Sequence, residues 1–297
     1  MRSLKRRLCF SIIVLVLFGV IQTHAQCTPL KGTENLWTLP SLHWLLIGEL
    51  HGSNEAPEAV IDIVCDALAH GRQITVALER PTREQTALEG MLLEPDVEKA
   101  RQRLLKEPGW RVDPDSANIP DGRTSQAMLC LLIALRELHK RDATLSVAAF
   151  DAPFTGSDPG ARDAVLGSTL LALGNAEPTK LIVVLTGNLH VMQSPVHGYD
   201  LAAMKLPAAQ RLSLEVTDKG GDSWSSNGHG CGVYSGGVGN NGMADQRGIF
   251  LDPRLAPFGK VDGILSLGQP LTASLPAAGE PSPLLACRVQ YQTKPHP

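Results

Sequence analysis

Four polar residues directly follow three apolar segments of the sequence and could together carry out acid–base chemistry. Glu49 and His51 lie two residues apart after the first segment, so both side chains leave the same face if the chain stays extended there. Glu79 and His190 follow two further apolar segments. Imidazoles and carboxylates transfer protons near neutral pH, and the same groups bind zinc, manganese or iron. The sequence therefore predicts these four residues as catalytic groups and as ligands of a divalent metal, with metal-free acid–base catalysis as the alternative.

Five more polar residues, at segment ends or near the start of the helix expected over 159–173, are candidates for binding a substrate. They are Arg80, Asp151, Arg162, Asp163 and Asn188. Asp151 ends a further apolar segment, and Asn188 lies two residues before His190. Arg80 and Arg123 could bind an anionic group of a substrate, although solvated arginines are the commoner outcome.

Each histidine of this set closes a Gly-x-x-His spacing, which begins at Gly48 or at Gly187. Composition alone predicts roughly one such spacing by chance, so the spacing itself is a weak signal. Both instances nevertheless close a buried segment. A glycine there lets the backbone leave a strand where a side chain would block a crevice.

The alternation of apolar and amphipathic segments predicts the elements that position these residues. Buried strands are expected over 43–47, 74–78, 145–150, 181–185 and 212–216, and helices over 54–71, 82–106, 125–140 and 159–173. Strands separated by helices form a parallel sheet covered on both faces, so we expect an α/β fold in one domain. Short strands over 248–251, 263–267 and 285–291 are predicted to extend the sheet. Polar groups just past the carboxyl ends of such strands converge on one crevice.

Two segments lack any helical or strand periodicity. The Pro/Asp-rich link 107–122 is interpreted as a loop at the rim of a pocket. The glycine-rich segment 219–248 is predicted to be a surface loop, and a lid over the site is the alternative.

The N-terminal 25 residues are typical of an export signal. A positively charged start is followed by an apolar run, and Thr23-His24-Ala25 places small residues at a cleavage site. We therefore expect a periplasmic or secreted protein without stable membrane insertion. An exported compartment permits disulfides, and among the five cysteines that remain after cleavage a Cys231–Cys287 bridge is favoured.

Composition excludes several classes of function. The chain has 297 residues, with 27 basic residues against 30 acidic ones and 4% aromatic residues, so we expect no nucleic-acid partner. The sequence contains no Gly-x-Ser-x-Gly elbow, P-loop or dinucleotide-binding motif, which disfavours serine hydrolases, nucleotide hydrolases and dehydrogenases.

Four short motifs in this order resemble a known superfamily. They are Leu46-Ile47-Gly48-Glu49-Leu50-His51-Gly52, Ala77-Leu78-Glu79, Arg162-Asp163 and Thr186-Gly187-Asn188-Leu189-His190. The superfamily joins the haem-binding ChaN-like lipoproteins, the TIKI/TraB proteins and the erythromycin esterases, and the resemblance covers roughly residues 41–217. It implies an α/β fold with the paired Gly-x-x-His elements and a glutamate at one pocket.

The resemblance implies different activities for different branches. The TIKI-like members are metal-dependent proteases and the erythromycin esterases hydrolyse a lactone, so His51 and His190 would be metal ligands or the general base. Glu49 and Glu79 would then orient them or activate water. ChaN-like members instead bind haem without turnover. The sequence thus favours an exported hydrolase of an ester, lactone or amide bond in a small molecule or peptide, with a haem- or cofactor-binding protein as the alternative.

Overall fold

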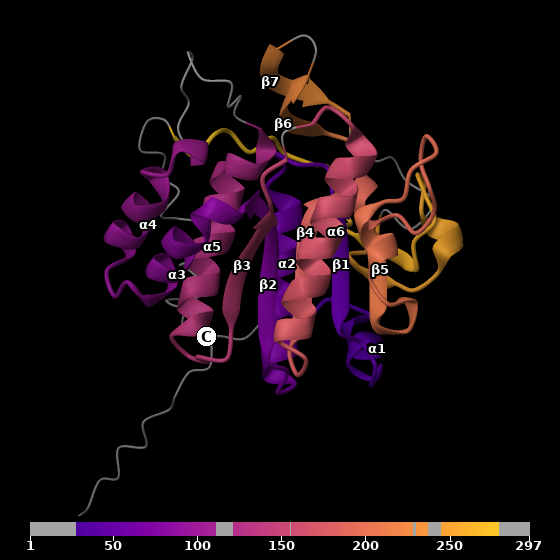
Figure 1. Cartoon of the computed structure of the whole chain (residues 1–297), viewed down its shortest axis with the longest axis horizontal. Coiled ribbons are helices and arrows are strands. Elements are labelled where there is room, and N and C mark those ends of the chain that lie inside the picture. Colours follow the sequence, from indigo (N-terminus) through magenta and orange to yellow (C-terminus); the bar gives the residue numbers. More distant parts are fainter. Residues whose placement is uncertain (1–27, 111–120, 155, 228–229, 237–244, 279–297) are drawn as a thin grey trace, which may run out of the picture.

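A computed structural model describes residues 28–110, 121–154, 156–227, 230–236 and 245–278, which form an α/β fold (Figure 1). Its main sheet has seven strands in the order β3-β2-β4-β1-β5-β9-β8. All neighbouring pairs are parallel except β8 with β9. The predicted mainly parallel sheet with short strands added near its C-terminal side is therefore confirmed.

The strands of the main sheet match the apolar segments of the sequence. They are β1 Trp44–Glu49, β2 Ile74–Pro81, β3 Ser146–Asp151, β4 Leu181–Gly187, β5 Arg211–Thr217, β8 Gly248–Phe250 and β9 Gly263–Ser266. Most side chains of β1, β2 and β4 are buried, as expected for the central strands of a parallel sheet.

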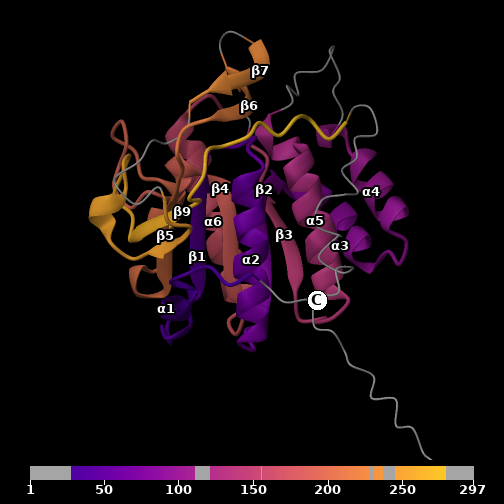
Figure 2. The ribbon, with the colours of Figure 1, turned by 180° about the vertical axis from the view of Figure 1, so that it is seen from behind.

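Helices cover both faces of the sheet. They are α1 Thr33–Trp37, α2 Glu55–Ala69, α3 Gln85–Leu93, α4 Val97–Leu105, α5 Gln126–His139 and α6 Pro159–Ala176. Leu45 and Ile47 of β1 pack into the core cluster that holds residues of α2 and α5, whereas Trp44 and Leu46 pack with α6. The opposed views in Figures 1 and 2 show α6 on one face and α2 on the other. Alternate side chains of β1 therefore pack against the helices on opposite faces of the sheet.

Short 3₁₀ helices connect these elements. They are η1 Thr82–Glu84, η2 Pro108–Trp110, η3 Gly122–Thr124, η4 Asn188–Val191, η5 Ala202–Lys205, η6 Ala208–Gln210 and η7 Pro253–Leu255. Two of them, η3 and η4, carry residues of the candidate site. The N-terminus of α6 is fixed by Asp158, whose side chain accepts the Gly160 N–H, and this cap sets the place of Arg162 and Asp163 in the first turns.

The glycine-rich segment differs from the predicted loop. It contains an antiparallel hairpin of β6 Asp222–Asn227 and β7 Gly230–Ser235. The Trp224 N–H donates to the Gly52 carbonyl at 3.0 Å, so the hairpin is fixed to the turn that follows His51. This hairpin is held by backbone hydrogen bonds, which any sequence can form. Its sequence therefore lacks the alternation of apolar and polar residues that would have predicted two strands.

Several predictions fall on residues that the structure does not describe. These are the export signal over 1–25, the strand over 285–291 and the Cys231–Cys287 bridge, for which Cys287 and the Cys231 side chain are not described. Within the described ranges, no helix combines the length and apolar character needed to cross a membrane.

Candidate active site

The candidate site lies at the carboxyl ends of the parallel strands. Glu49 ends β1, Asp151 ends β3, and Glu79 lies near the end of β2. Gly187 ends β4 and leads into η4, which carries His190. These residues are far apart in sequence, and the parallel sheet brings them to one edge.

His51 lies between two buried glutamates. Its Nδ1 is 3.0 Å from Glu49 Oε1, and its Nε2 is 3.3 Å from Glu79 Oε2. Burial alone would lower the pKa of His51, but the hydrogen bonds to Glu49 and Glu79 raise this pKa to about 10. His51 is therefore a positively charged imidazolium at neutral pH.

The two glutamates have opposite electrostatic environments. Burial raises the pKa of Glu49 above its ordinary value despite the His51 hydrogen bond. Burial would also raise the pKa of Glu79, but the His51 hydrogen bond and the nearby cations, including Arg123, hold this pKa well below its ordinary value. Glu79 is thus the permanent carboxylate of the site.

His190 has a different set of partners from His51. Its Nδ1 lies 2.8 Å from Asp163 Oδ1, and Arg162 Nη1 lies 3.1 Å from its Nε2. A guanidinium can only donate, so Nε2 must accept and the ring proton must lie on Nδ1. Asp163 is 2% exposed and also accepts the Ala202 N–H at 3.0 Å, which fixes the carboxylate and through it the imidazole. Asp163 and Arg162 therefore hold His190 with its proton on Nδ1 and with Nε2 as an acceptor.

Glu79 connects the two halves of the site. Besides His51, it accepts hydrogen bonds from Thr186 Oγ1 at 2.6 Å, Gly187 N at 3.0 Å, Arg162 Nη2 at 2.9 Å and Arg123 Nη1 at 3.0 Å. The same two arginines each contact Asp151 Oδ2 at 3.1 Å. The network thus holds two guanidinium groups on Glu79, the carboxylate that also contacts His51.

A small space between the two imidazoles lies over Gly187. A Cβ atom on this glycine would lie 3.3 Å from His51 Nε2, 3.5 Å from His190 Cδ2 and 3.8 Å from Glu79 Oε2. The His51 side chain is 22% exposed and the His190 side chain is 12% exposed. Solvent therefore reaches both rings, and the space over Gly187 is the point at which a small group would meet both.

Gly48 allows the turn that carries His190 to pack on β1. A Cβ on Gly48 would lie 2.4 Å from Val191 Cγ2 and 2.9 Å from Asn188 Cα. The backbone of Asn188, a predicted substrate-binding residue, therefore packs against Gly48 in the contact between η4 and β1.

The structure does not bring Arg80 into this site. Its side chain is buried, lies over the Trp110 ring and donates to Glu84 at 2.7–3.0 Å. Its Nη1 also donates to the Arg123 carbonyl at 3.1 Å. Arg80 thus supports the turn that carries Arg123, rather than facing the space over Gly187.

Sequence reasoning missed one residue of the site, Asp121. Asp121 holds the Arg123 guanidinium through two contacts, at 2.6 and 2.8 Å. The sequence suggested Arg123 as an anion-binding residue and did not single out Asp121. Asp121 lies within the Pro/Asp-rich link 107–122 and Arg123 directly after it, and no periodic signal there indicates which residues turn toward the sheet.

The four predicted metal ligands do not fit a metal in this arrangement. Both ring nitrogens of His51 and of His190 already have hydrogen-bond partners, and two guanidinium groups contact Glu79. Within the part of the chain that the structure describes, no group of three or more histidine, cysteine, aspartate or glutamate side chains could hold a metal ion.

Haem also fits poorly at these histidines. An axial haem ligand needs a free ring nitrogen beside an apolar surface. The Nε2 of His51 faces Glu79, and the Nε2 of His190 faces Arg162. A charged side chain therefore contacts the Nε2 atom of each histidine, where a haem iron would have to bind.

Comparison with known proteins gives matches for the fold alone. No protein-family model and no curated protein sequence matches this chain. A variant of erythromycin esterase EreC in its open conformation aligns with a TM-score of 0.57 and 10% identity, over 84% of this chain and 95% of that one. A succinoglycan biosynthesis protein aligns with a TM-score of 0.55 and 10% identity, over 84% of this chain and 89% of that one. Haem-bound ChaN of Campylobacter jejuni aligns with a TM-score of 0.37 and 10% identity, over 62% of this chain and 84% of that one.

The first two matches confirm, for the fold, the resemblance that the short motifs indicate. Their identities to this chain are too low to transfer the role of any residue. The overlap with ChaN is too loose to support a functional comparison.

Proposed function

We propose that this protein is a hydrolase of ester, lactone or amide bonds that works by acid–base catalysis at His51 and His190. The observation that carries the proposal is the contrast between two histidines on either side of the space over Gly187. His51 is a cation held between two glutamates, and His190 has an accepting Nε2 opposite the Nδ1 that faces Asp163. A neutral imidazole held by a carboxylate is the general base of many hydrolases, and a cation stabilises the charge that develops on a carbonyl oxygen.

The roles follow from the contacts of each histidine. His190 Nε2 takes a proton from a water molecule lying over Gly187, and the water oxygen attacks the carbonyl carbon. The negative charge on the carbonyl oxygen is stabilised by the His51 imidazolium and by Arg162, which moves from His190 Nε2 to the substrate. When the bond to the leaving group breaks, that group receives the proton held by His190. The products are a carboxylic acid and an alcohol or amine.

The remaining residues have positioning roles in this proposal. Asp163 fixes the tautomer of His190, because it accepts the Nδ1 proton. Glu49 and Glu79 keep His51 protonated. The likeness in fold to an erythromycin esterase makes esters and lactones the first substrates to test.

The experiment measures hydrolysis of aryl esters, macrocyclic lactones and blocked peptides by the purified protein. His190→Ala and His51→Ala should each lower the rate about 10²- to 10⁴-fold, the range expected for loss of an acid–base group. His70→Ala is the matched control, because its half-exposed side chain lies at the end of α2. A chelator should leave the rate unchanged. Full activity of both site variants on every hydrolysed substrate would contradict the proposal.

We also propose that the chain is exported and acts in the periplasm or outside the cell. The signal-like N-terminal segment supports this proposal, as do Cys65 on α2 and Cys130 on α5, which are disulfide-bonded. Disulfides persist in oxidising compartments and are rare in the cytosol. N-terminal sequencing of the protein from each cell fraction should find a chain that begins at Gln26 outside the cytosol. An intact N-terminus confined to the cytosol would contradict export.

A further inference from the structure

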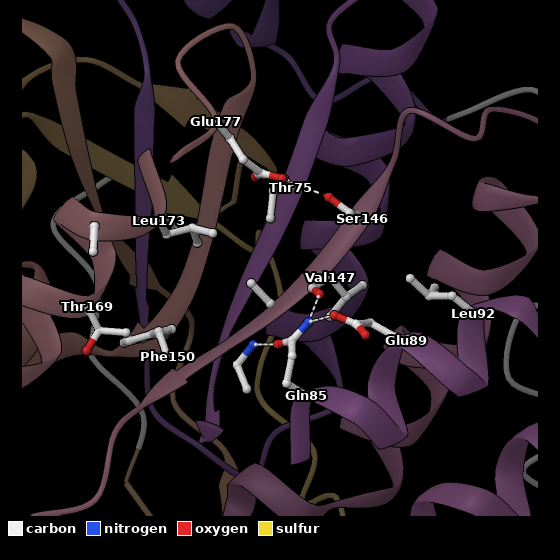
Figure 3. A pocket seen from close by; sticks show the side chains of 13 residues that line it. Thr75, Gln85, Glu89, Leu92, Ser146, Val147, Phe150, Thr169, Leu173 and Glu177 are labelled. Atoms are coloured by element: carbon white, nitrogen blue, oxygen red, sulfur yellow. Dashed lines mark hydrogen bonds between the residues drawn. The ribbon is translucent and has the colours of Figure 1, made fainter. Parts of the chain in front are cut away.

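A groove lies along β3, at the edge of the main sheet and away from the candidate active site. It has a volume of about 430 Å³, which is within the usual range for binding clefts. Figure 3 shows its walls: Leu173 and Thr169 of α6 on one side, and Glu89 and Leu92 of α3 on the other. The backbone of β3 forms the floor between them.

β3 is an edge strand, because β2 is its one neighbour in the sheet order. The outer edge of such a strand presents backbone N–H and C=O groups that can pair with another chain. In this structure the side chain of Gln85 covers two of them. Its Nε2 donates to the Val147 carbonyl at 3.0 Å, and its Oε1 accepts the Ala149 N–H at 2.8 Å (Figure 3).

The two hydrogen bonds of the Gln85 side chain follow the pattern of a parallel strand pair. In a parallel ladder, one residue of the added strand donates to the carbonyl before its counterpart and accepts from the N–H after it. The Gln85 carboxamide makes this pair of bonds around Ala148. It therefore stands in the place of one residue of a strand parallel to β3.

The charge of the groove indicates which strand would fit. Its lining includes two acidic side chains, Glu89 and Glu177, and no lysine or arginine. Glu177 already accepts from Lys180 at 2.9 Å, whereas the exposed Glu89 accepts the Gln85 amide at 2.9 Å. A basic side chain on an incoming segment would pair best with Glu89, and alternate apolar side chains would meet Leu173 and Phe150.

We propose that this groove docks an extended peptide segment that carries basic side chains and pairs with β3 as a parallel strand after Gln85 moves away. A second copy of this chain is a poorer occupant, because a two-fold axis perpendicular to the sheet would pair the two edge strands antiparallel. The proposal goes beyond the proposed function and does not depend on it.

The test uses the full protein and a fluorescein-labelled hexapeptide of alternating valine and lysine, followed by fluorescence anisotropy. Wild-type protein should bind the peptide saturably. Gln85→Ala should bind it roughly fivefold tighter, because the peptide no longer competes with the side-chain amide for Val147 and Ala149. Gln102→Ala, an exposed glutamine on α4, is the matched control and should leave binding unchanged.

Two further comparisons separate strand pairing from simple charge attraction. A peptide with the same side chains but an N-methylated backbone should lose binding, since it lacks the N–H donors of a strand. Ala172→Arg, at an exposed position of α6 that lines the groove, should weaken binding at least roughly tenfold, whereas Ser168→Arg on the same helix should not. Circular dichroism checks that each variant is folded.

Three results would overturn the proposal. They are no saturable binding to wild type or to Gln85→Ala, equal binding of the N-methylated peptide, and binding to Ala172→Arg as tight as to wild type. Slower hydrogen exchange at the Ala149 amide in the presence of the peptide would place the contact on β3 directly.

Discussion

At the scale of single residues, the site is controlled by groups that hold a proton in one place. His51 and His190 are the same residue type at the ends of neighbouring strands, yet their partners differ. Glu49 and Glu79 make His51 a cation, while Asp163 and Arg162 hold His190 with its Nε2 as a hydrogen-bond acceptor. A pair of titratable groups with such different environments is the pattern expected for an acid and a base in one reaction.

Gly187→Ala tests whether the space between the two imidazoles is where the reaction occurs. The backbone of Gly187 has φ −62° and ψ 146°, which alanine adopts freely. The new methyl group would lie 3.3 Å from His51 Nε2, and we expect the hydrolysis rate to fall about 100-fold with an unchanged melting temperature.

The control for that substitution is Gly232→Ala in β7, where the added Cβ meets the Tyr234 ring at 4.0 Å. Unaltered hydrolysis by Gly187→Ala would show that water and substrate do not use this space.

At the scale of elements, the strand ends were predictable and the supporting turns were not. Glu49, Glu79 and His190 follow apolar runs, and such runs indicate parallel strands whose carboxyl ends meet. Arg80 was misplaced because neighbouring residues of a strand point to opposite faces, so a group next to Glu79 turns away from the site. Asp121 lies near the end of the Pro/Asp-rich link, which has no periodic pattern from which its position could be predicted.

Arg80→Met tests the support that β2 gives to η3. The substitution leaves the buried Glu84 carboxylate without its cation, so we expect a loss of about 3–5 kcal/mol in the free energy of unfolding. The double variant Arg80→Met with Glu84→Met should recover much of this loss, since it removes both charges. Urea unfolding measures both; a loss under about 1 kcal/mol in the single variant would contradict a buried ion pair.

At the scale of the whole molecule, burial of ionisable groups makes stability depend on pH. The pKa of His51 is raised to about 10, so its contribution to stability is complete below pH 6.5 and is lost as the pH rises through 10. Burial raises the pKa of Glu215 to about 7, and its contribution is likewise lost as the pH rises from 4.5 through 7. The pKa of Glu79 is lowered, so its contribution to stability has the opposite pH dependence and is lost as the pH falls below 4.5.

We therefore expect the free energy of unfolding to decrease from about pH 5 to pH 10, as measured by urea denaturation at intervals of pH. Glu215→Gln should make the decrease between about pH 5 and 7 shallower and leave the decrease from pH 7 to 10, because His51 is unchanged. A wild-type protein whose stability increases from pH 6 to 10 would contradict these assignments.

The fold class could be predicted because it depends on long apolar runs, which every large parallel sheet requires. The β6–β7 hairpin could not, since its ladder and its bond to Gly52 use backbone atoms, which any sequence provides. The contacts of Arg123 with Glu79 and Asp151 likewise join residues with no common sequence pattern.

The scattered origin of the site has a consequence for refolding of the chain. Glu49, Glu79, Arg123, Arg162 and His190 come from five separate segments, and the parallel sheet of strands that are distant in sequence brings these segments together. No early intermediate with part of the sheet can hold them together, because parallel pairings between remote segments form late. Turnover should therefore return in the slowest phase after dilution from denaturant, later than the far-ultraviolet signal of the helices.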